Sequence, residues 1–245
     1  MAYIEFNALS KYLGGSFSAG VFAPELKEMK DDKRTDKKYP VLYLIHDDGG
    51  DFSDIHGIEG IEKLASELKM YIIAPSIAHS FCLDMDYGPE YEKFISKEFP
   101  GICRNMFSIK DAGEGVYIGG IGTGAYGAAM IAKKYPKMFE KCICINGQFD
   151  VVELFQKAED GEALPYENLE MLKAIFGPLE KLRGSEKDIL ADTRKSTDIP
   201  IYITAEKKNA YYNESIQFSE KTACIMQEGK DLSQMVKDAI CWLMK

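Results

Sequence analysis

One segment constrains this chain more than any other: a buried strand, a turn crowded with glycine, and a helix of small residues. Residues 116–132 read VYIGGIGTGAYGAAMIA. The apolar, β-branched start is typical of a buried strand, and the alanine-rich end favours a helix. Between them, Gly122, Gly124 and Gly127 match the dinucleotide-binding pattern G-x-G-x-x-G. Gly120 and Gly124 also flank an apex in the pattern of a nucleophile elbow, G-x-S-x-G, but the apex here is Gly122, which carries no nucleophile.

Strands and helices alternate along the rest of the chain, which predicts an α/β fold with a mainly parallel sheet and helices on both faces. A long helix is expected over residues 87–105, with an interruption at Pro100-Gly101. Residues 147–198 are polar and helix-rich without an evident strand, which predicts a small helical cap insertion. We expect residues 1–245 to form a single domain that carries this cap.

Charge and hydropathy exclude several classes of function. The 245 residues include 39 acidic and 30 basic side chains, a net charge of −9 that argues against nucleic-acid binding. No segment approaches the roughly 18 consecutive apolar residues of a membrane helix, and the start MAYIEFNALS lacks the features of a secretory signal. We therefore expect a cytoplasmic protein that contacts neither nucleic acid nor membrane; a homo-oligomer is possible.

The context of the glycine turn departs from a dinucleotide-binding unit. Such a unit places an acidic residue about 20 positions on, at the end of the next strand, where it binds the ribose. Here Glu140 precedes that strand and Asn146 ends it. The turn also follows three or more expected strands, whereas the fingerprint usually opens the nucleotide domain. Dinucleotide binding through Gly122, Gly124 and Gly127 stays an alternative to the elbow.

The surroundings of the turn resemble the putative esterase family of α/β-hydrolases, which includes S-formylglutathione hydrolase (esterase D) and the tributyrin and acetyl-ester esterases. The family's elbow, GLSMGGYGA, is similar without a gap to residues 120–128, GIGTGAYGA. Its YPVLYLLHG strand is similar to residues 39–46, YPVLYLIH, and its YG-x-x-Y…ELP segment to residues 87–91 with 98–100. The resemblance is closest to the tributyrin esterase branch, and it implies an α/β-hydrolase fold and ester hydrolysis by a Ser–His–Asp triad.

The positions that would carry this chemistry are altered. Gly122 stands at the serine, and Lys207 stands at the acid. The base is expected in a G-x-H segment, but residues 228–231 read EGKD and no histidine follows His79 in the sequence. Asp47 stands where the family has the glycine of its oxyanion loop, and Asp48 follows it. A carboxylate beside a site meant to stabilise developing negative charge opposes that task.

These departures predict a catalytically degenerate esterase-family protein that uses no cofactor and has a binding or regulatory role through the vestigial cleft. Its partner would be a small molecule or a protein. The candidate residues of this cleft, beside Asp47 and Asp48, are Thr123, His46, His79 and Glu206. An active carboxylic-ester hydrolase with a non-standard site is the first alternative, and dinucleotide binding is the second.

An acidic loop forms a further candidate site. Carboxylate-rich loops can hold calcium or another divalent ion, although the spacing here is not that of an EF-hand. Acidic loops are also commonly just solvated surface, and both interpretations stay open. The residues concerned are Asp47, Asp48, Asp51, Asp54 and His56.

Overall fold

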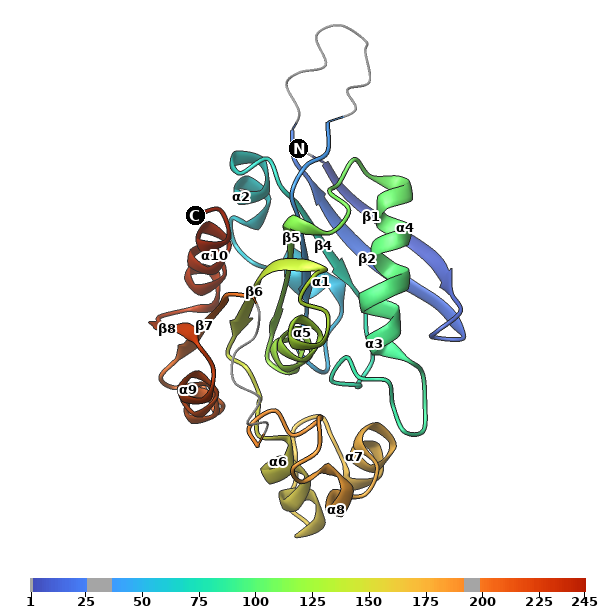
Figure 1. Ribbon diagram of the computed structural model, residues 1–245, viewed down its shortest axis with the longest axis vertical. Helices are drawn as coiled ribbons and strands as arrows, with labels where there is room; N and C mark the ends of the chain where they lie inside the picture. Colours follow the sequence, from blue (N-terminus) through green and yellow to red (C-terminus); the bar gives the residue numbers. More distant parts are fainter. Residues whose placement is uncertain (1, 26–36, 192–198) are drawn as a thin grey trace, which may run out of the picture.

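The computed structural model describes residues 2–25, 37–191 and 199–245. Within them, eight strands form one sheet in the order β1-β2-β4-β3-β5-β6-β7-β8 (Figure 1). β1 (Ala2–Ser10) and β2 (Gly15–Ala23) form an antiparallel hairpin, and β2 pairs antiparallel with β4. The other pairs are parallel, which confirms the expected mainly parallel sheet. They join β3 (Val41–Ile45), β4 (Tyr71–Pro75), β5 (Gly113–Ile121), β6 (Phe139–Ile145), β7 (Ile201–Glu206) and β8 (Cys224–Gly229).

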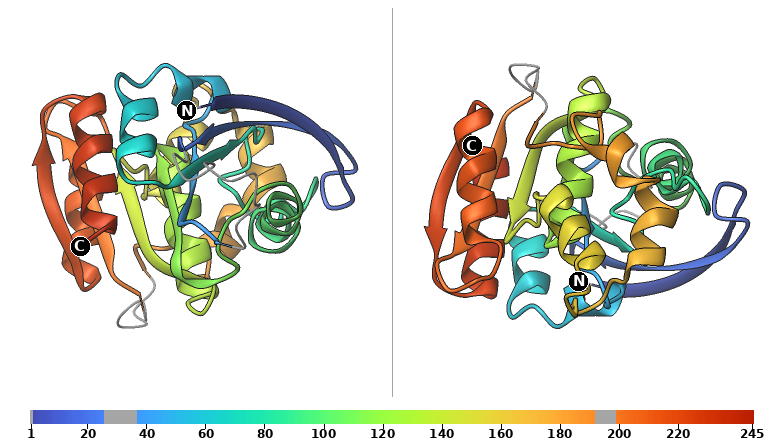
Figure 2. Two further views of the ribbon diagram at one scale, coloured as in Figure 1. Left: turned by 90° about the horizontal axis from the view of Figure 1, so that it is seen from above. Right: turned by 90° about the horizontal axis from the view of Figure 1, so that it is seen from below.

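Helices cover both faces of the sheet (Figure 2), as expected. On one face, a buried apolar cluster packs beneath α1 (Phe52–His56), α2 (Ile61–Glu67) and α10 (Leu232–Leu243). On the other face, a larger cluster packs beneath α3 (Tyr91–Lys93), α4 (Phe99–Met106), α5 (Thr123–Lys134) and α9 (Tyr212–Lys221). Because β3 and β4 are buried at every position, they are continuous apolar runs, as parallel strands covered on both sides usually are.

The segment after β6 lies beyond the carboxyl ends of the parallel strands (Figure 1). It contains α6 (Val151–Glu159), α7 (Leu169–Phe176) and α8 (Leu179–Leu182), and no strand over residues 147–191. The remaining residues of the expected cap, 192–198, lie outside the described ranges. The ring of Phe176 packs edge-on against Phe81, and the Tyr126 hydroxyl donates to the carbonyl of Lys187 at 2.5 Å. These contacts attach the segment to α5.

The helical stretch before β5 differs from its predicted form. It begins at Tyr91 and runs through α3, a π-helical turn (Phe94–Glu98) and α4 without a break. The predicted interruption at Pro100-Gly101 is wrong. Pro100 lies just after the π-helical turn, where the regular i→i−4 hydrogen-bond pattern is already interrupted. The irregular turn precedes the proline.

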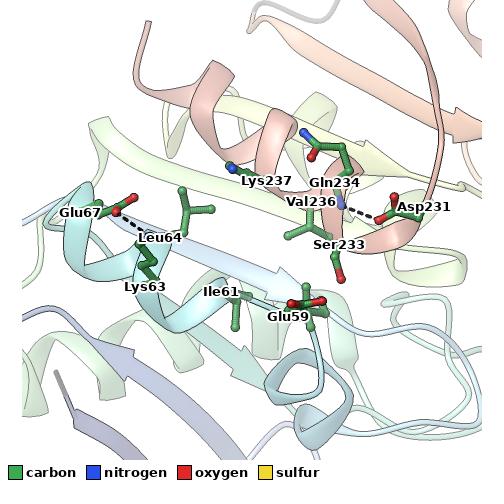
Figure 3. A pocket seen from close by; sticks show the side chains of 12 residues that line it. Glu59, Ile61, Lys63, Leu64, Glu67, Asp231, Ser233, Gln234, Val236 and Lys237 are labelled. Carbon is green, nitrogen blue, oxygen red and sulfur yellow. Dashed lines mark hydrogen bonds and ion pairs between the residues drawn. The ribbon is translucent and has the colours of Figure 1, made fainter.

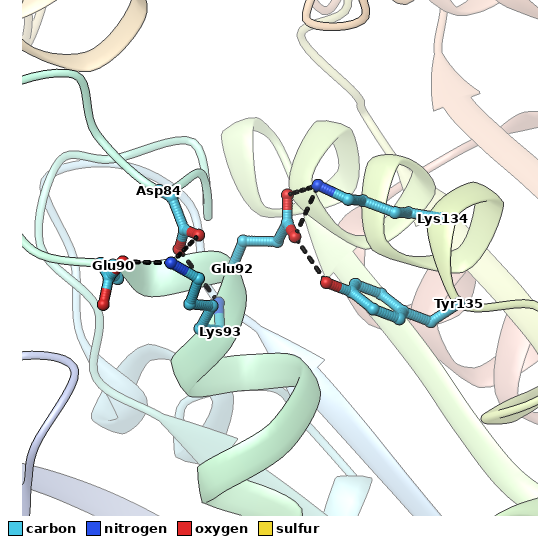
Figure 4. Close-up of polar contacts among 6 residues, drawn as sticks. All are labelled: Asp84, Glu90, Glu92, Lys93, Lys134 and Tyr135. Carbon is cyan, nitrogen blue, oxygen red and sulfur yellow. Dashed lines mark hydrogen bonds and ion pairs between the residues drawn. The ribbon is translucent and has the colours of Figure 1, made fainter.

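A polar network ties this helical stretch to the far end of α5 (Figure 4). The carboxylate of Glu92, which is buried, accepts from the Tyr135 hydroxyl at 2.7 Å and pairs with Lys134 Nζ at 2.9 Å. On the next residue, Lys93 Nζ lies 3.4 Å from a carboxylate oxygen of Asp84. The carboxyl end of α5 is therefore anchored by Glu92 of α3.

The amino end of α5 is positioned by close backbone packing. A Cβ on Gly120 would lie 2.1 Å from the carbonyl of Gly124. A Cβ on Gly124 would lie 2.4 Å from the carbonyl oxygen of His46, and one on Gly127 would lie 2.4 Å from the side chain of Cys82. Since real Cβ atoms do not approach so closely, these glycines allow the helix to lie directly against β3 and β5.

We expect Gly124→Ala to lower the free energy of unfolding by about 1–3 kcal/mol or more, because its methyl group meets fixed backbone. Gly101→Ala in α4 is the matched control, since its Cβ would have its nearest neighbour at 3.8 Å. That control should raise stability by about 0.5–1 kcal/mol through helix propensity. Urea denaturation of both variants measures the two effects, and equal stabilities would contradict the packing argument.

Candidate active site

Gly122 forms the apex of a tight turn between β5 and α5. Its φ is +57° and its ψ is −120°, a region that glycine enters without a steric penalty. Its N–H donates to the carbonyl of Ile145 at 3.0 Å, and its own carbonyl accepts from the N–H groups of Ala125 and Gln148 at 3.1 and 3.2 Å. The strand, turn and helix expected from the sequence are present, and the apex carries no side chain.

The side chain of Asp47, from the loop after β3, reaches across to this turn. Its Oδ1 accepts from the backbone N–H of Thr123 at 2.9 Å and from the N–H of Asp48 at 2.8 Å. The Thr123 hydroxyl lies 3.4 Å from the same oxygen. In a nucleophile elbow, the N–H after the apex and an N–H from the loop after β3 form the oxyanion hole. The Asp47 carboxylate thus receives both of these donors, at distances suited to an oxyanion.

The same carboxylate fills the space that an apex side chain would need. A Cβ built on Gly122 would lie 1.8 Å from Asp47 Oδ1 and 2.0 Å from its Cγ. A serine at position 122 and Asp47 in this conformation therefore exclude each other. The sequence predicted that Asp47 would lie beside the oxyanion hole, whereas the structure puts its carboxylate inside it.

Burial is the main influence on the Asp47 carboxyl and raises its pKa above the ordinary value of an aspartate. The N–H groups of Thr123 and Asp48 oppose this by stabilising the anion, and they offset burial only in part. The amino end of α5 adds a favourable field, because helix amino termini attract negative charge. The carboxylate is thus held by local donors against a cost of desolvation.

His46 has a structural place under this loop. It is buried, its Nε2 accepts from the N–H of Ile77 at 3.0 Å, and its Nδ1 lies 2.6 Å from the carbonyl of Asp47. Because Nε2 accepts, the proton belongs on Nδ1, which donates to that carbonyl. Both ring nitrogens are therefore engaged with the backbone, and His46 is not free to act as a base.

The other predicted residues of the cleft come from neighbouring strand ends. His79, after β4, has its Nδ1 3.3 Å from a carboxylate oxygen of Asp48. Glu206 ends β7, where its N–H donates to the side-chain carbonyl of Asn146 at 2.9 Å. Lys207, at the position of the family's acid, is exposed in the turn that follows. The carboxyl ends of β3, β4, β5, β6 and β7 thus bring most of the predicted residues to one edge of the sheet.

The side chains of the acidic loop point to different parts of the structure. Asp51 and Asp54 form a capping box at the start of α1, and His56 stacks on the ring of Tyr3 with centroids 4.2 Å apart. Asp47 and Asp48 turn the other way, toward Thr123 and His79. Among the described residues, no three His, Cys, Asp or Glu side chains are arranged to hold a metal ion. Helix capping and ring stacking explain these residues instead.

The dinucleotide alternative also loses its basis. Gly124 and Gly127 face the protein's own backbone and Cys82, so close packing of α5 accounts for both. The amino end of α5, where a pyrophosphate would bind, is occupied by the Asp47 carboxylate. The glycine pattern therefore arises from helix-to-sheet packing.

Three residues of the site were missed from the sequence. Glu167 comes from the cap, where the resemblance is weakest, and burial raises the pKa of its carboxyl. Burial also raises the pKa of Tyr211, with the Asp47 carboxylate as the next influence. Glu214 Oε2 accepts from the N–H groups of Phe149 and Asp150, both at 2.7 Å. None of the sequence motifs pointed to these three residues.

A cavity elsewhere in the molecule is separate from this site. It has a volume of about 370 Å³ and lies between α2 and α10, on the face opposite α5 (Figure 3). Ile61, Leu64 and Val236 contribute apolar surface, and Lys63 and Glu67 stand at its rim. None of its lining residues comes from the turn at Gly122 or from the loops around it.

Comparisons with known proteins agree with one another. Residues 10–216 match the family model described as "Putative esterase". The acetyl esterase of Caldicellulosiruptor saccharolyticus is 30% identical over 196 residues, which cover 78% of this chain and 73% of the esterase. In the described parts of the chain, no helix is long and apolar enough to cross a membrane.

Two solved structures from Staphylococcus aureus have the same fold. The substrate-bound fluorophosphonate-binding serine hydrolase F aligns with a TM-score of 0.85 and 23% identity, over 100% of this chain and 98% of that one. The S-formylglutathione hydrolase FrmB aligns with a TM-score of 0.83 and 23% identity, over 100% and 99%. The fold is thus that of the α/β-hydrolases, as the sequence predicted.

We expect Gly122→Ser to destabilise the protein through both backbone strain, about 1–3 kcal/mol, and the clash with Asp47. Adding Asp47→Gly removes the clash, so the double variant should be more stable than the sum of the single effects predicts. A coupling of about 0.5–3 kcal/mol is expected for residues in contact. Gly161→Ser is the matched control, since Gly161 has φ +80° and open space around it. If denaturant melts show that the effects of Gly122→Ser and Asp47→Gly simply add, the predicted clash between the serine side chain and Asp47 is contradicted.

Stability should fall as pH rises through the titration of Glu214. Burial raises the pKa of this carboxyl from 4.5 to about 7. Between these values the native state keeps the proton that the unfolded state has released, so the free energy of unfolding decreases with pH. Glu214→Gln should reduce this decrease by up to about 3 kcal/mol. The control Glu159→Gln, at an exposed position, should leave the decrease of the free energy of unfolding with pH unchanged. Identical pH profiles for wild type and Glu214→Gln would contradict the assignment.

Proposed function

The chain belongs to the Esterase family, and we propose that it has lost serine-dependent ester hydrolysis and acts by binding a ligand at the former active site. One observation carries this proposal. The Asp47 carboxylate accepts hydrogen bonds from Thr123 and Asp48 where a substrate oxyanion would bind, and it overlaps the space of a serine side chain. Acyl transfer needs both an exposed nucleophile and a free oxyanion hole.

The surrounding residues support the loss of hydrolysis. Thr123 offers the nearest hydroxyl to the apex, but it is only 3% exposed and its Oγ1 faces Asp47 Oδ1. His46 is engaged through both ring nitrogens, and Lys207 stands at the position of the family's acid. A hydroxyl becomes a nucleophile when a base accepts its proton, and a third group usually orients that base. The described arrangement offers no such chain at the apex.

A binding role is supported by polar groups that remain buried at the same edge of the sheet. Oxygens of Asp48 and Glu167 are buried without a hydrogen bond. Buried polar atoms without partners cost stability, so they are usually explained by a bound group or by function. They come from the loop after β3 and from the cap, the two elements that flank the turn at Gly122.

The proposal predicts that the purified protein will not hydrolyse p-nitrophenyl acetate or butyrate above a protein blank, and that a fluorophosphonate probe will not label it. The reason is that such probes report only activated hydroxyl groups. The serine hydrolase F of S. aureus, whose title describes it as fluorophosphonate-binding, is the positive control. The catalytic loss would be refuted by turnover on the order of 1 per second, or by stoichiometric labelling that disappears in Thr123→Val.

A further inference from the structure

A group of polar atoms beside the turn at Gly122 is buried and has no hydrogen-bond partner. It consists of Asp48 Oδ2, both carboxylate oxygens of Glu167, and His79 Nδ1. The Asp48 side chain is 6% exposed, and Glu167 is also 6% exposed. Three carboxylate oxygens are thus withdrawn from water, and the backbone N–H groups of Tyr166 and Glu167 and the ring of His79 stabilise them only in part.

These atoms belong to one electrostatic neighbourhood. His79 Nδ1 lies 3.3 Å from Asp48 Oδ2, although the two do not meet in hydrogen-bond geometry. Asp48 is, after burial, the leading influence that raises the pKa of the Glu167 carboxyl, and His79 lowers it. The loops after β3 and β4 and the segment before α7 therefore converge here.

The neighbourhood carries an excess of acidic groups. Two more buried carboxyls, Asp47 and Glu214, have pKa values raised mainly by burial, as do those of Asp48 and Glu167. Among the described residues, no lysine or arginine is one of the charged groups that most strongly influence the pKa values of these four carboxyls. Both ring nitrogens of His46 are engaged with the backbone, whereas the ring of His79 contacts Asp48.

We propose that the ligand of this site is a small organic primary amine, bound as its ammonium ion by Asp48 and Glu167. This inference rests on the proposed binding role of the former active site and names the chemistry of its ligand. An alkylammonium group presents three N–H donors and no acceptor, which complements two buried carboxylates that no lysine or arginine among the described residues neutralises. Charge-assisted hydrogen bonds of this kind are stronger than neutral ones. A metal ion fits less well, since no three ligating side chains are arranged for one among the described residues.

The test uses n-butylamine as the probe, at about pH 8, where the amine is protonated. Isothermal titration calorimetry and thermal melts of the full chain should show saturable binding and a saturable rise in melting temperature. n-Butyltrimethylammonium, which has the same charge but no N–H donor, should produce neither. Glu167→Gln should weaken binding of n-butylamine about tenfold or more. Glu220→Gln, an equal charge change at an exposed position, should leave it unchanged.

Glu167→Gln should also melt at a higher temperature than the wild type when no amine is present, because it removes a buried carboxylate for which burial outweighs the local donors. This readout shows that the variant folds. The proposal is overturned if n-butylamine does not bind, if n-butyltrimethylammonium binds equally well, or if calcium or zinc stabilises the protein and the amine does not. A protein that binds n-butylamine and also hydrolyses esters would refute the loss of catalysis and leave the amine site standing.

Discussion

The hydrogen bonds from Thr123 and Asp48 to the Asp47 carboxylate hold the candidate site in its present form. They join the loop after β3 to the first residue of α5, across the turn that the fold uses for a nucleophile. One side chain thereby satisfies two backbone donors that the fold directs at a reacting oxygen. A donor pair of this kind attracts negative charge, and here the chain supplies that charge itself.

This interaction and the glycine at the apex depend on each other. Asp47 needs the space above Gly122, and a side chain at position 122 would displace the carboxylate from its two donors. The helix that presents Thr123 is fixed at its other end by Glu92, so the turn cannot readily move to accommodate both groups. Gly122 and Asp47 therefore form one physical arrangement, in which the Asp47 carboxylate occupies the space above the glycine and takes both backbone donors.

Much of the scaffold could be predicted because its determinants are local. Residues 116–132 specify a strand, a turn and a helix within one segment, and the structure has all three. Pro100 misled because the sequence does not show the π-helical turn that precedes it, after which the helix continues. The role of the acidic loop could not be decided from the sequence, because composition does not reveal that Asp51 caps a helix while Asp47 crosses to another strand end. Glu167 reaches the site only through the tertiary placement of the cap.

The direct measurement of the Asp47 contact is an NMR titration of the backbone amide protons of Thr123 and Asp48. A carboxylate that accepts from both N–H groups should shift both resonances together as it loses its proton. Their common pKa should lie above the ordinary value of an aspartate, because burial is the main influence on Asp47. Both shifts should vanish in Asp47→Asn. Amide resonances that do not respond to pH, or that respond equally in the variant, would contradict the account.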